Sequence, residues 1–129
     1  MNQPDYSVIA AWHDALNTGD VDRLITLSSD DVEVVGPRGA GRGAQLLRDW
    51  VTRSGIRLEL RRLFARDSTA VAEEVAEWRA PDTSEIVDRQ HLATIFRIED
   101  GRVSSIDRRP TLADALHVAG LDESNLRPA

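Results

Sequence analysis

The sequence contains no cysteine and no lysine among its 129 residues, and all 16 of its basic residues are arginines. The absence of cysteine excludes disulfides, thiolate metal sites and a thiol nucleophile. The absence of lysine excludes Schiff-base chemistry and the phosphate-binding lysine of a P-loop. No apolar run approaches the roughly 20 residues of a membrane span, and the start of the chain lacks the pattern of a secretory signal. We therefore expect a cytoplasmic protein with no membrane partner.

The charge is negative and evenly mixed. The formal net charge is −6, and arginines alternate with acids in stretches such as RLELRRLFARD and DRQHLATIFRIEDGR. Nucleic-acid-binding proteins usually present a basic face, so we expect no nucleic acid partner. The hydrophobic share of 41% is that of one globular domain. We expect this domain to span residues 1–129, with a core at about 6–116 and a frayed tail at 121–129.

A glycine-rich stretch, DDVEVVGPRGAGRG at residues 30–43, raises the question of a phosphate-binding loop. A dinucleotide fingerprint requires G-x-G-x-x-G between a strand and a helix of a βαβ unit, whereas this chain has G-x-G-x-G. The sequence therefore predicts a short strand at VEVV, a turn at GPRG and a loop at GAGRG. The three histidines lie in different predicted elements without the spacing of metal ligands, so we expect no metal site and no cofactor.

Helical periodicity dominates the first half of the chain and strand periodicity the second. Helices are predicted from about Pro4 to Asn17, after a cap at Asp20, and over residues 44–53. Strands are then predicted at IRLEL, TAVAEEVAEWR, EIVDRQHLATIFRI and RVSSIDRR, followed by a helix over residues 112–119. This order predicts an α+β domain in which helices cover one face of an antiparallel sheet. The other face must be polar or pack against a second subunit.

This order of elements resembles the nuclear transport factor 2-like superfamily. The resemblance rests on LNTGDVDRLITLSSDDVEVVGPRG near the start and FRIEDGRVSSI near the end, and it covers about residues 6–116. It is closest to the SnoaL-like branch of polyketide cyclases and ketosteroid isomerase-like domains. It implies a conical barrel, with three N-terminal helices packed on a strongly bent, mostly antiparallel sheet and a short C-terminal helix. It also implies a hydrophobic pocket for a small apolar molecule, and a homodimer formed through the outer sheet face.

The catalytic residues of these relatives carry over poorly. The base aspartate of ketosteroid isomerases falls on Gly36, their oxyanion-hole tyrosine on Trp12, and their proton-donating aspartic acid near Thr94. These departures argue against ketosteroid isomerase activity. Epoxide hydrolases and cyclases of this branch carry an acid where this chain has Arg108. The neighbouring Asp107 would replace that acid if the strand register shifted by one residue.

Strand alternation places small and aromatic residues of 70–78 and 88–98 on one face, which we assign to the cavity floor. The opposite face then forms an outer surface on which Glu77 and Arg89 pair across strands. The inner face carries one carboxylate, Glu74. It acts as a general acid or base, or forms a structural pair with Arg108, or lies in water at the sheet rim; the sequence leaves these alternatives open. The predicted catalytic residues are Glu74, Arg108 and Asp107, and the predicted substrate-binding residues are Trp12, Trp50, Trp78, Gln90, Thr94 and Phe96.

Three functions are compatible with this pattern. The first, which we favour, is a cofactor-independent cyclase, isomerase, dehydratase or hydrolase acting on an apolar metabolite, a class that includes polycyclic compounds. The second is a non-catalytic ligand-binding protein or a dimeric accessory domain, which the missing catalytic residues favour. The third is a protein-binding adaptor, for which the charged outer face provides little support.

Overall fold

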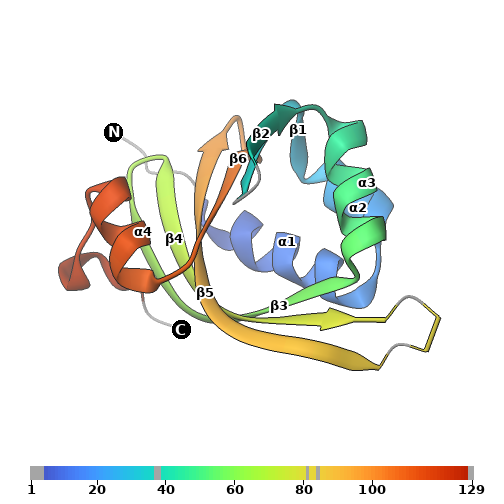
Figure 1. Cartoon of the computed structure of the whole chain (residues 1–129). Helices are drawn as coiled ribbons and strands as arrows, with labels where there is room; N and C mark the ends of the chain where they lie inside the picture. The colour runs from blue at the N-terminus through green and yellow to red at the C-terminus, as the bar shows by residue number, and fades with distance from the viewer. Residues whose placement is uncertain (1–4, 37–38, 81, 84, 128–129) are drawn as a thin grey trace.

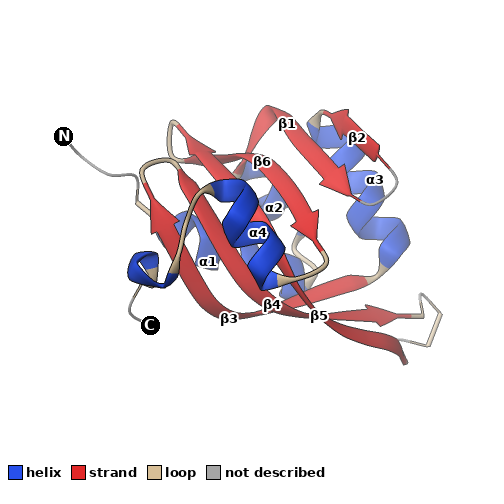
Figure 2. Ribbon diagram, turned by 60° about the vertical axis from the view of Figure 1, so that its left-hand side comes forward, coloured by secondary structure: helices blue, strands red, loops and turns tan. Residues whose placement is uncertain are grey.

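The computed structural model describes residues 5–36, 39–80, 82–83 and 85–127, and within them helices lie on both faces of a six-stranded sheet (Figures 1 and 2). This arrangement confirms the predicted α+β class. In chain order the elements are α1 (Ser7–Thr18), α2 (Val21–Thr26), β1 (Ser28–Gly36), β2 (Gly39–Arg42), α3 (Ala44–Ser54), β3 (Ile56–Arg66), β4 (Thr69–Arg79), β5 (Ile86–Glu99), β6 (Arg102–Arg109), α4 (Leu112–Ala119) and the 3₁₀ helix η1 (Glu123–Asn125).

The sheet has the strand order β2-β1-β6-β5-β4-β3. Its neighbours are antiparallel except for the parallel pairing of β1 with β6, and the hairpins from β3 to β6 confirm the predicted meander. The sheet curves around α1 but does not close, since β2 and β3 lie at opposite ends of the strand order (Figure 1). The barrel implied by the family resemblance is therefore an open, bent sheet.

Glycines follow the ends of three helices. Gly19, Gly55 and Gly120 adopt left-handed φ values of 76°, 60° and 72° after α1, α3 and α4. Gly55 is also sterically required, because a Cβ atom there would lie 2.5 Å from the carbonyl oxygen of Arg79. The predicted cap of α2 is confirmed too, since the Asp20 side chain accepts a hydrogen bond from the backbone of Arg23. The first helix begins at Ser7, and Pro4 lies outside the described residues.

The predicted loop at GAGRG is wrong over residues 39–42, which form β2. This strand pairs antiparallel with β1, with Gly41 opposite Val34 and Ala40 opposite Val35. Glycine is depleted in β-strands, so the glycine-rich sequence of β2 did not predict a strand. Packing favours glycine at position 41, because a Cβ atom there would clash with the side chain of Leu46 on α3.

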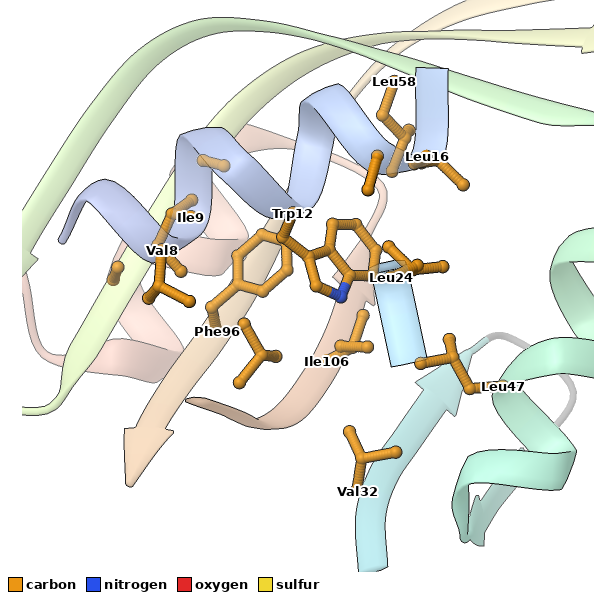
Figure 3. Close-up of a cluster of buried hydrophobic side chains, with 14 of the residues drawn as sticks. Val8, Ile9, Trp12, Leu16, Leu24, Val32, Leu47, Leu58, Phe96 and Ile106 are labelled. Atoms are coloured by element: carbon orange, nitrogen blue, oxygen red, sulfur yellow. The ribbon is translucent and has the colours of Figure 1, made fainter. Parts of the chain in front are cut away.

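The main core lies between α1, α2, α3 and the concave sheet face. Trp12 sits at its centre and packs against Phe96, with ring centroids 5.2 Å apart (Figure 3). Its indole nitrogen donates a hydrogen bond of 3.2 Å to the hydroxyl of Ser28, which in turn donates to the backbone of Leu24. Burial of such large side chains is the main stabilising contribution in a domain of this size.

The outer sheet face is only partly polar, so its predicted character is wrong over one half. There α4 and the residues after it lie over the sheet (Figure 2). They cover an apolar strip. This second cluster consists of Phe64, Val71, Ala93, Ile95, Ala115 and Leu121. The other half, carried by β4 and the start of β5, is charged, and the predicted pair of Glu77 with Arg89 is confirmed there.

The edge strand β3 is covered by two segments distant in sequence. The side-chain amide of Asn17 forms hydrogen bonds to both backbone groups of Leu58, at 2.8 and 2.9 Å. Further along β3, Leu126 pairs with Phe64, and the backbone nitrogen of Arg127 donates to the carbonyl of Leu63 at 2.8 Å. The predicted frayed tail is therefore wrong over residues 121–127. Among the described residues, no helix is long and apolar enough to cross a membrane.

Candidate functional site

A pocket with a volume of about 650 Å³ opens between α3, the β1–β2 hairpin and the inner ends of β4 and β6. We call it the Trp50–Trp78 pocket. Aliphatic and indole side chains supply most of its side-chain lining, and two arginines are the charged members. The lining residues are Val34, Val35, Gly36, Gly39, Ala40, Gly41, Leu46, Trp50, Arg53, Ser54, Trp78, Ile106 and Arg108.

Arg108 lies at the inner side of this pocket and is half-buried. Its guanidinium carbon lies 5.8 Å from the ring centre of Trp78, within the range of a cation–π contact. Burial lowers the pKa of Arg108, and the negative charge of Glu74 partly offsets that effect. In the described part of the chain, Arg108 has no hydrogen bond and no carboxylate within ion-pair distance.

Next to Arg108 lies a buried polar network built on Glu74. The Oε2 atom of Glu74 lies 2.5 Å from Nε2 of His13, and its Oε1 atom accepts a hydrogen bond of 2.6 Å from the hydroxyl of Thr94. Glu74 has no exposed surface, while His13 and Thr94 are 3% and 1% exposed. The inward position predicted for Glu74 is confirmed, and both of its oxygens are hydrogen-bonded.

The hydrogen bonds limit the protonation forms that this network can adopt. Nδ1 of His13 lies 2.8 Å from the carbonyl oxygen of Ile9, and because a carbonyl only accepts, Nδ1 carries a proton. One further proton is then shared between Nε2 of His13 and Oε2 of Glu74. The pair is either an imidazolium with a carboxylate or an imidazole with a carboxylic acid, and its net charge is zero in both forms. That neutrality allows the pair to be buried.

His13 reaches Glu74 because of its place on α1. The apolar face of α1 is buried against the sheet and has the spacing i, i+3, i+4, i+7, at Ile9, Trp12, His13 and Leu16. The site residues predicted from the sequence do not include His13. Its signal was a polar residue inside an apolar helical stripe, a position that demands a buried partner.

The buried network of Glu74, His13 and Thr94 is adjacent to the pocket but is not part of its lining. Thr94 on β5 pairs with Arg108 on β6, so the network and the pocket lining adjoin at this pair. Glu74, His13 and Thr94 do not line the pocket. The structural pair of Glu74 with Arg108 that the sequence offered as an alternative does not form, because His13 occupies that position.

The remaining predicted site residues divide between pocket, core and surface. Trp50 and Trp78 line the pocket. Trp12 and Phe96 are completely buried in the main core. Gln90, predicted to bind substrate, is instead exposed on β5 and donates a hydrogen bond to Asp88.

Asp107 lies on the opposite face of the sheet from Arg108. Its carboxylate is 2.9 Å from Arg109, which also approaches Asp114 of α4 at 3.6 Å. The register pairs Thr94 with Arg108 and Ile95 with Asp107, so the one-residue shift that would bring Asp107 inward does not occur. Among the described residues, no group of three or more histidine and acidic side chains is placed to hold a metal ion.

Comparisons with known proteins agree with this architecture. A structure of an epoxide hydrolase of the limonene-epoxide hydrolase type from M. tuberculosis is 16% identical, with a TM-score of 0.72 over 92% of this chain and 89% of that one. A protein of unknown function from Cytophaga hutchinsonii, of the nuclear transport factor 2-like type, is 12% identical, with a TM-score of 0.70 over 83% and 90% of the two chains.

A third structure comes from Catenulispora acidiphila, has a ketosteroid isomerase-like fold and is in complex with trimethylamine. It is 18% identical, with a TM-score of 0.69 over 94% of this chain and 96% of that one. No curated protein matches the sequence. The sequence profile of the family described as SnoaL-like domain, however, matches residues 9–106. The chain therefore belongs to the SnoaL-like domain family.

Proposed function

We propose that this protein is a cofactor-independent enzyme that binds a small, largely apolar molecule in the Trp50–Trp78 pocket and transforms it by proton transfer. Cyclisation, isomerisation, dehydration and hydrolysis all fall within this class. The observation that carries the proposal is the buried pair of Glu74 and His13 beside Arg108, a pocket-lining cation. The related structures that hold trimethylamine or are described as an epoxide hydrolase support small-molecule chemistry on this fold.

Each residue has a defined part in the proposed reaction. Glu74 exchanges the proton with the ligand, since it is the one acidic group of the network. His13 shares that proton and keeps the buried site neutral, and Thr94 fixes the second carboxylate oxygen. Arg108 stabilises negative charge that develops on an oxygen of the ligand, as a preorganised donor in a water-poor site does.

The proposed reaction requires an opening step. Glu74 is fully buried. Arg108 on β6 is the residue that pairs with Thr94 on β5. Movement of the Arg108 side chain toward a ligand oxygen would uncover Thr94 and the carboxylate behind it. The ligand itself would supply the contacts that favour the open arrangement.

The substitution Glu74→Gln tests this proposal without disrupting the site. A glutamine amide can donate to Nε2 of a neutral His13 while its oxygen accepts from Thr94, so each hydrogen bond of Glu74 has a replacement. With a substrate identified from a panel of flat ketones, lactones and epoxides, we expect kcat to fall by about 100-fold or more. Ligand affinity should change little.

The matched control is Glu73→Gln, which removes the same charge from the adjacent residue on the outer face. It should retain kcat, because Glu73 pairs with Arg62 away from the pocket. Full turnover by the Glu74→Gln variant, with unchanged circular dichroism, would exclude Glu74 as the acid or base.

A second candidate is a ligand-binding protein without catalytic activity. It is favoured by one observation: both oxygens of Glu74 are occupied, and the residue does not line the pocket. Product analysis separates the two functions. A compound that saturates the protein and is recovered unchanged, with Glu74→Gln binding it equally well, supports the carrier or sensor.

A homodimer through the outer sheet face remains a proposal, now limited to the part that α4 leaves uncovered. Ile86 and Val87 on β5 are 46% and 64% exposed there. If the start of β5 forms the interface, the substitution Val87→Asp should shift the sedimentation coefficient from that of a dimer to that of a monomer. The control Val118→Asp, at a 49% exposed position on α4, should not. Sedimentation of the unmodified protein as a monomer at high concentration would contradict the dimer.

A further inference from the structure

Among the described residues, those that line the Trp50–Trp78 pocket include positively charged side chains and no acidic one. Arg53 and Arg108 are its charged members, and the lining residues include no aspartate or glutamate. This is unusual for a chain with a formal net charge of −6, in which acids outnumber arginines by 22 to 16. The pocket is therefore a local positive site on an acidic protein.

Arg108 lacks the carboxylate partner that several, though not all, other arginines of the sheet have. Arg62, Arg79 and Arg109 each bind a carboxylate at 2.8–3.2 Å. Arg108 has no hydrogen bond and no ion pair within the described part of the chain, although burial opposes its charge. The carboxylate whose field acts on it, that of Glu74, shares a proton with His13.

A guanidinium that lies over an indole keeps its N–H donors in its own plane, where they match the two oxygens of a carboxylate. Arg108 lies over Trp78 in this way. Arg53 is exposed at the pocket mouth. Its Nε donates a hydrogen bond to the carbonyl of Asp49, so its terminal amino groups remain available in the described structure. The site thus offers one partly buried cation and one exposed cation.

The rest of the lining favours a flat apolar ring. The indoles of Trp50 and Trp78 border the pocket together with Leu46, Val34 and Ile106. Aromatic rings stack on or meet indoles edge to face with a gain beyond the area buried. A ring with one anionic oxygen group would match both parts of the lining.

We propose that the ligand class of this pocket is an aromatic or conjugated monoanion, foremost a carboxylate, whose ring lies against Trp50 and Trp78 and whose charge is held by Arg108. This inference rests on the proposed function, of which it specifies the substrate class. Arg53 adds a weaker attraction at the mouth, because its charge is solvated.

The test compares two probes of nearly equal shape, 2-naphthoate and 2-naphthamide, by isothermal titration calorimetry at low and moderate salt. The anion should bind about 10- to 100-fold more tightly, the range of a charge-assisted hydrogen-bonded pair. Arg108→Gln should remove most of this preference while affinity for the amide changes less than about threefold. Arg53→Gln should reduce the preference by less and make it less sensitive to salt.

The control Arg97→Gln removes the same charge from an exposed position outside the pocket and should leave both affinities unchanged. Binding of the amide as tightly as the naphthoate would overturn the inference while leaving pocket binding intact. A preference for the anion that survives in Arg108→Gln would overturn the assignment to Arg108. Failure of both probes to bind at millimolar concentration would count against the inference and against the proposed pocket function together.

Discussion

Nε2 of His13 lies 2.5 Å from Oε2 of Glu74 and joins residues that are 61 positions apart in the chain. The contact connects α1 to the middle of β4 inside the main core. Because both side chains are almost completely buried, the pair stabilises the packing of α1 on β4 as well as being a candidate acid–base group. Stability measurements on the pair therefore complement the activity test.

Glu74→Ala should lower the free energy of unfolding by about 3–5 kcal/mol, the range for removing one partner of a buried charged pair. The reason is that His13 and Thr94 would lose their acceptor in a water-free site. Glu74→Gln should lower it by about 1 kcal/mol only, because its amide replaces both hydrogen bonds. Urea unfolding of both variants checks the difference. Equal losses would show that hydrogen bonding does not determine the stability of the network.

Ser28→Ala should lower the free energy of unfolding by about 1–3 kcal/mol, because the buried indole N–H of Trp12 would lose its acceptor. Thermal unfolding followed by circular dichroism measures the loss. Ser68→Ala, at an exposed turn, is the matched control and should change stability by less than about 0.5 kcal/mol. Similar losses in the two variants would contradict the role given to the Ser28 hydroxyl.

Gly55→Ala should destabilise the protein by about 1–3 kcal/mol from backbone strain, with the clash against Arg79 adding to that value. Gly36→Ala is the control, since a Cβ atom there meets nothing within 4 Å. The free energies of unfolding of the two variants, measured side by side, check the expectation. A tolerated alanine at position 55 would mean that the turn between α3 and β3 adapts.

Arg62→Gln should raise the pKa of Glu73 toward its ordinary value of 4.5. The pKa is lowered in the folded protein because Arg62 donates hydrogen bonds of 2.8 and 3.1 Å to the carboxylate. A lowered folded-state pKa contributes stability above the unfolded-state value, and this is lost as pH falls through the folded-state value. The variant should therefore be less stable by about 0.2–1 kcal/mol at neutral pH, with a smaller difference in acid.

An NMR titration of the Glu73 carboxyl measures this shift directly. Glu123→Gln is the control, because Glu123 lies 3.9 Å from Arg62 and is mostly exposed. It should leave the pKa of Glu73 nearly unchanged. A pKa of Glu73 that does not move in Arg62→Gln would assign its lowering to other charges.

The strands and their register follow from local alternation, which is why the inward position of Glu74 and the pairing of Glu77 with Arg89 could be predicted. The partnership of His13 with Glu74 could not, since it depends on how α1 lies across the sheet. The cover that α4 gives to the outer face does have a local signal in the sequence. Both faces of β4 and β5 are apolar around Val71 and Ile95, and a strand buried on both faces has this pattern.

The covered edge of β3 has a consequence for how the protein behaves in crowded solution. An exposed strand edge is a template for a neighbouring chain, and long β-strands such as those from β3 to β6 make uncontrolled polymerisation a hazard. Asn17 and the backbone around Leu126 occupy separate stretches of that edge, while the opposite end of the sheet is the short strand β2. The side chain of Asn17 and the backbone around Leu126 thus block strand pairing with another chain along these stretches of β3, which opposes fibre formation.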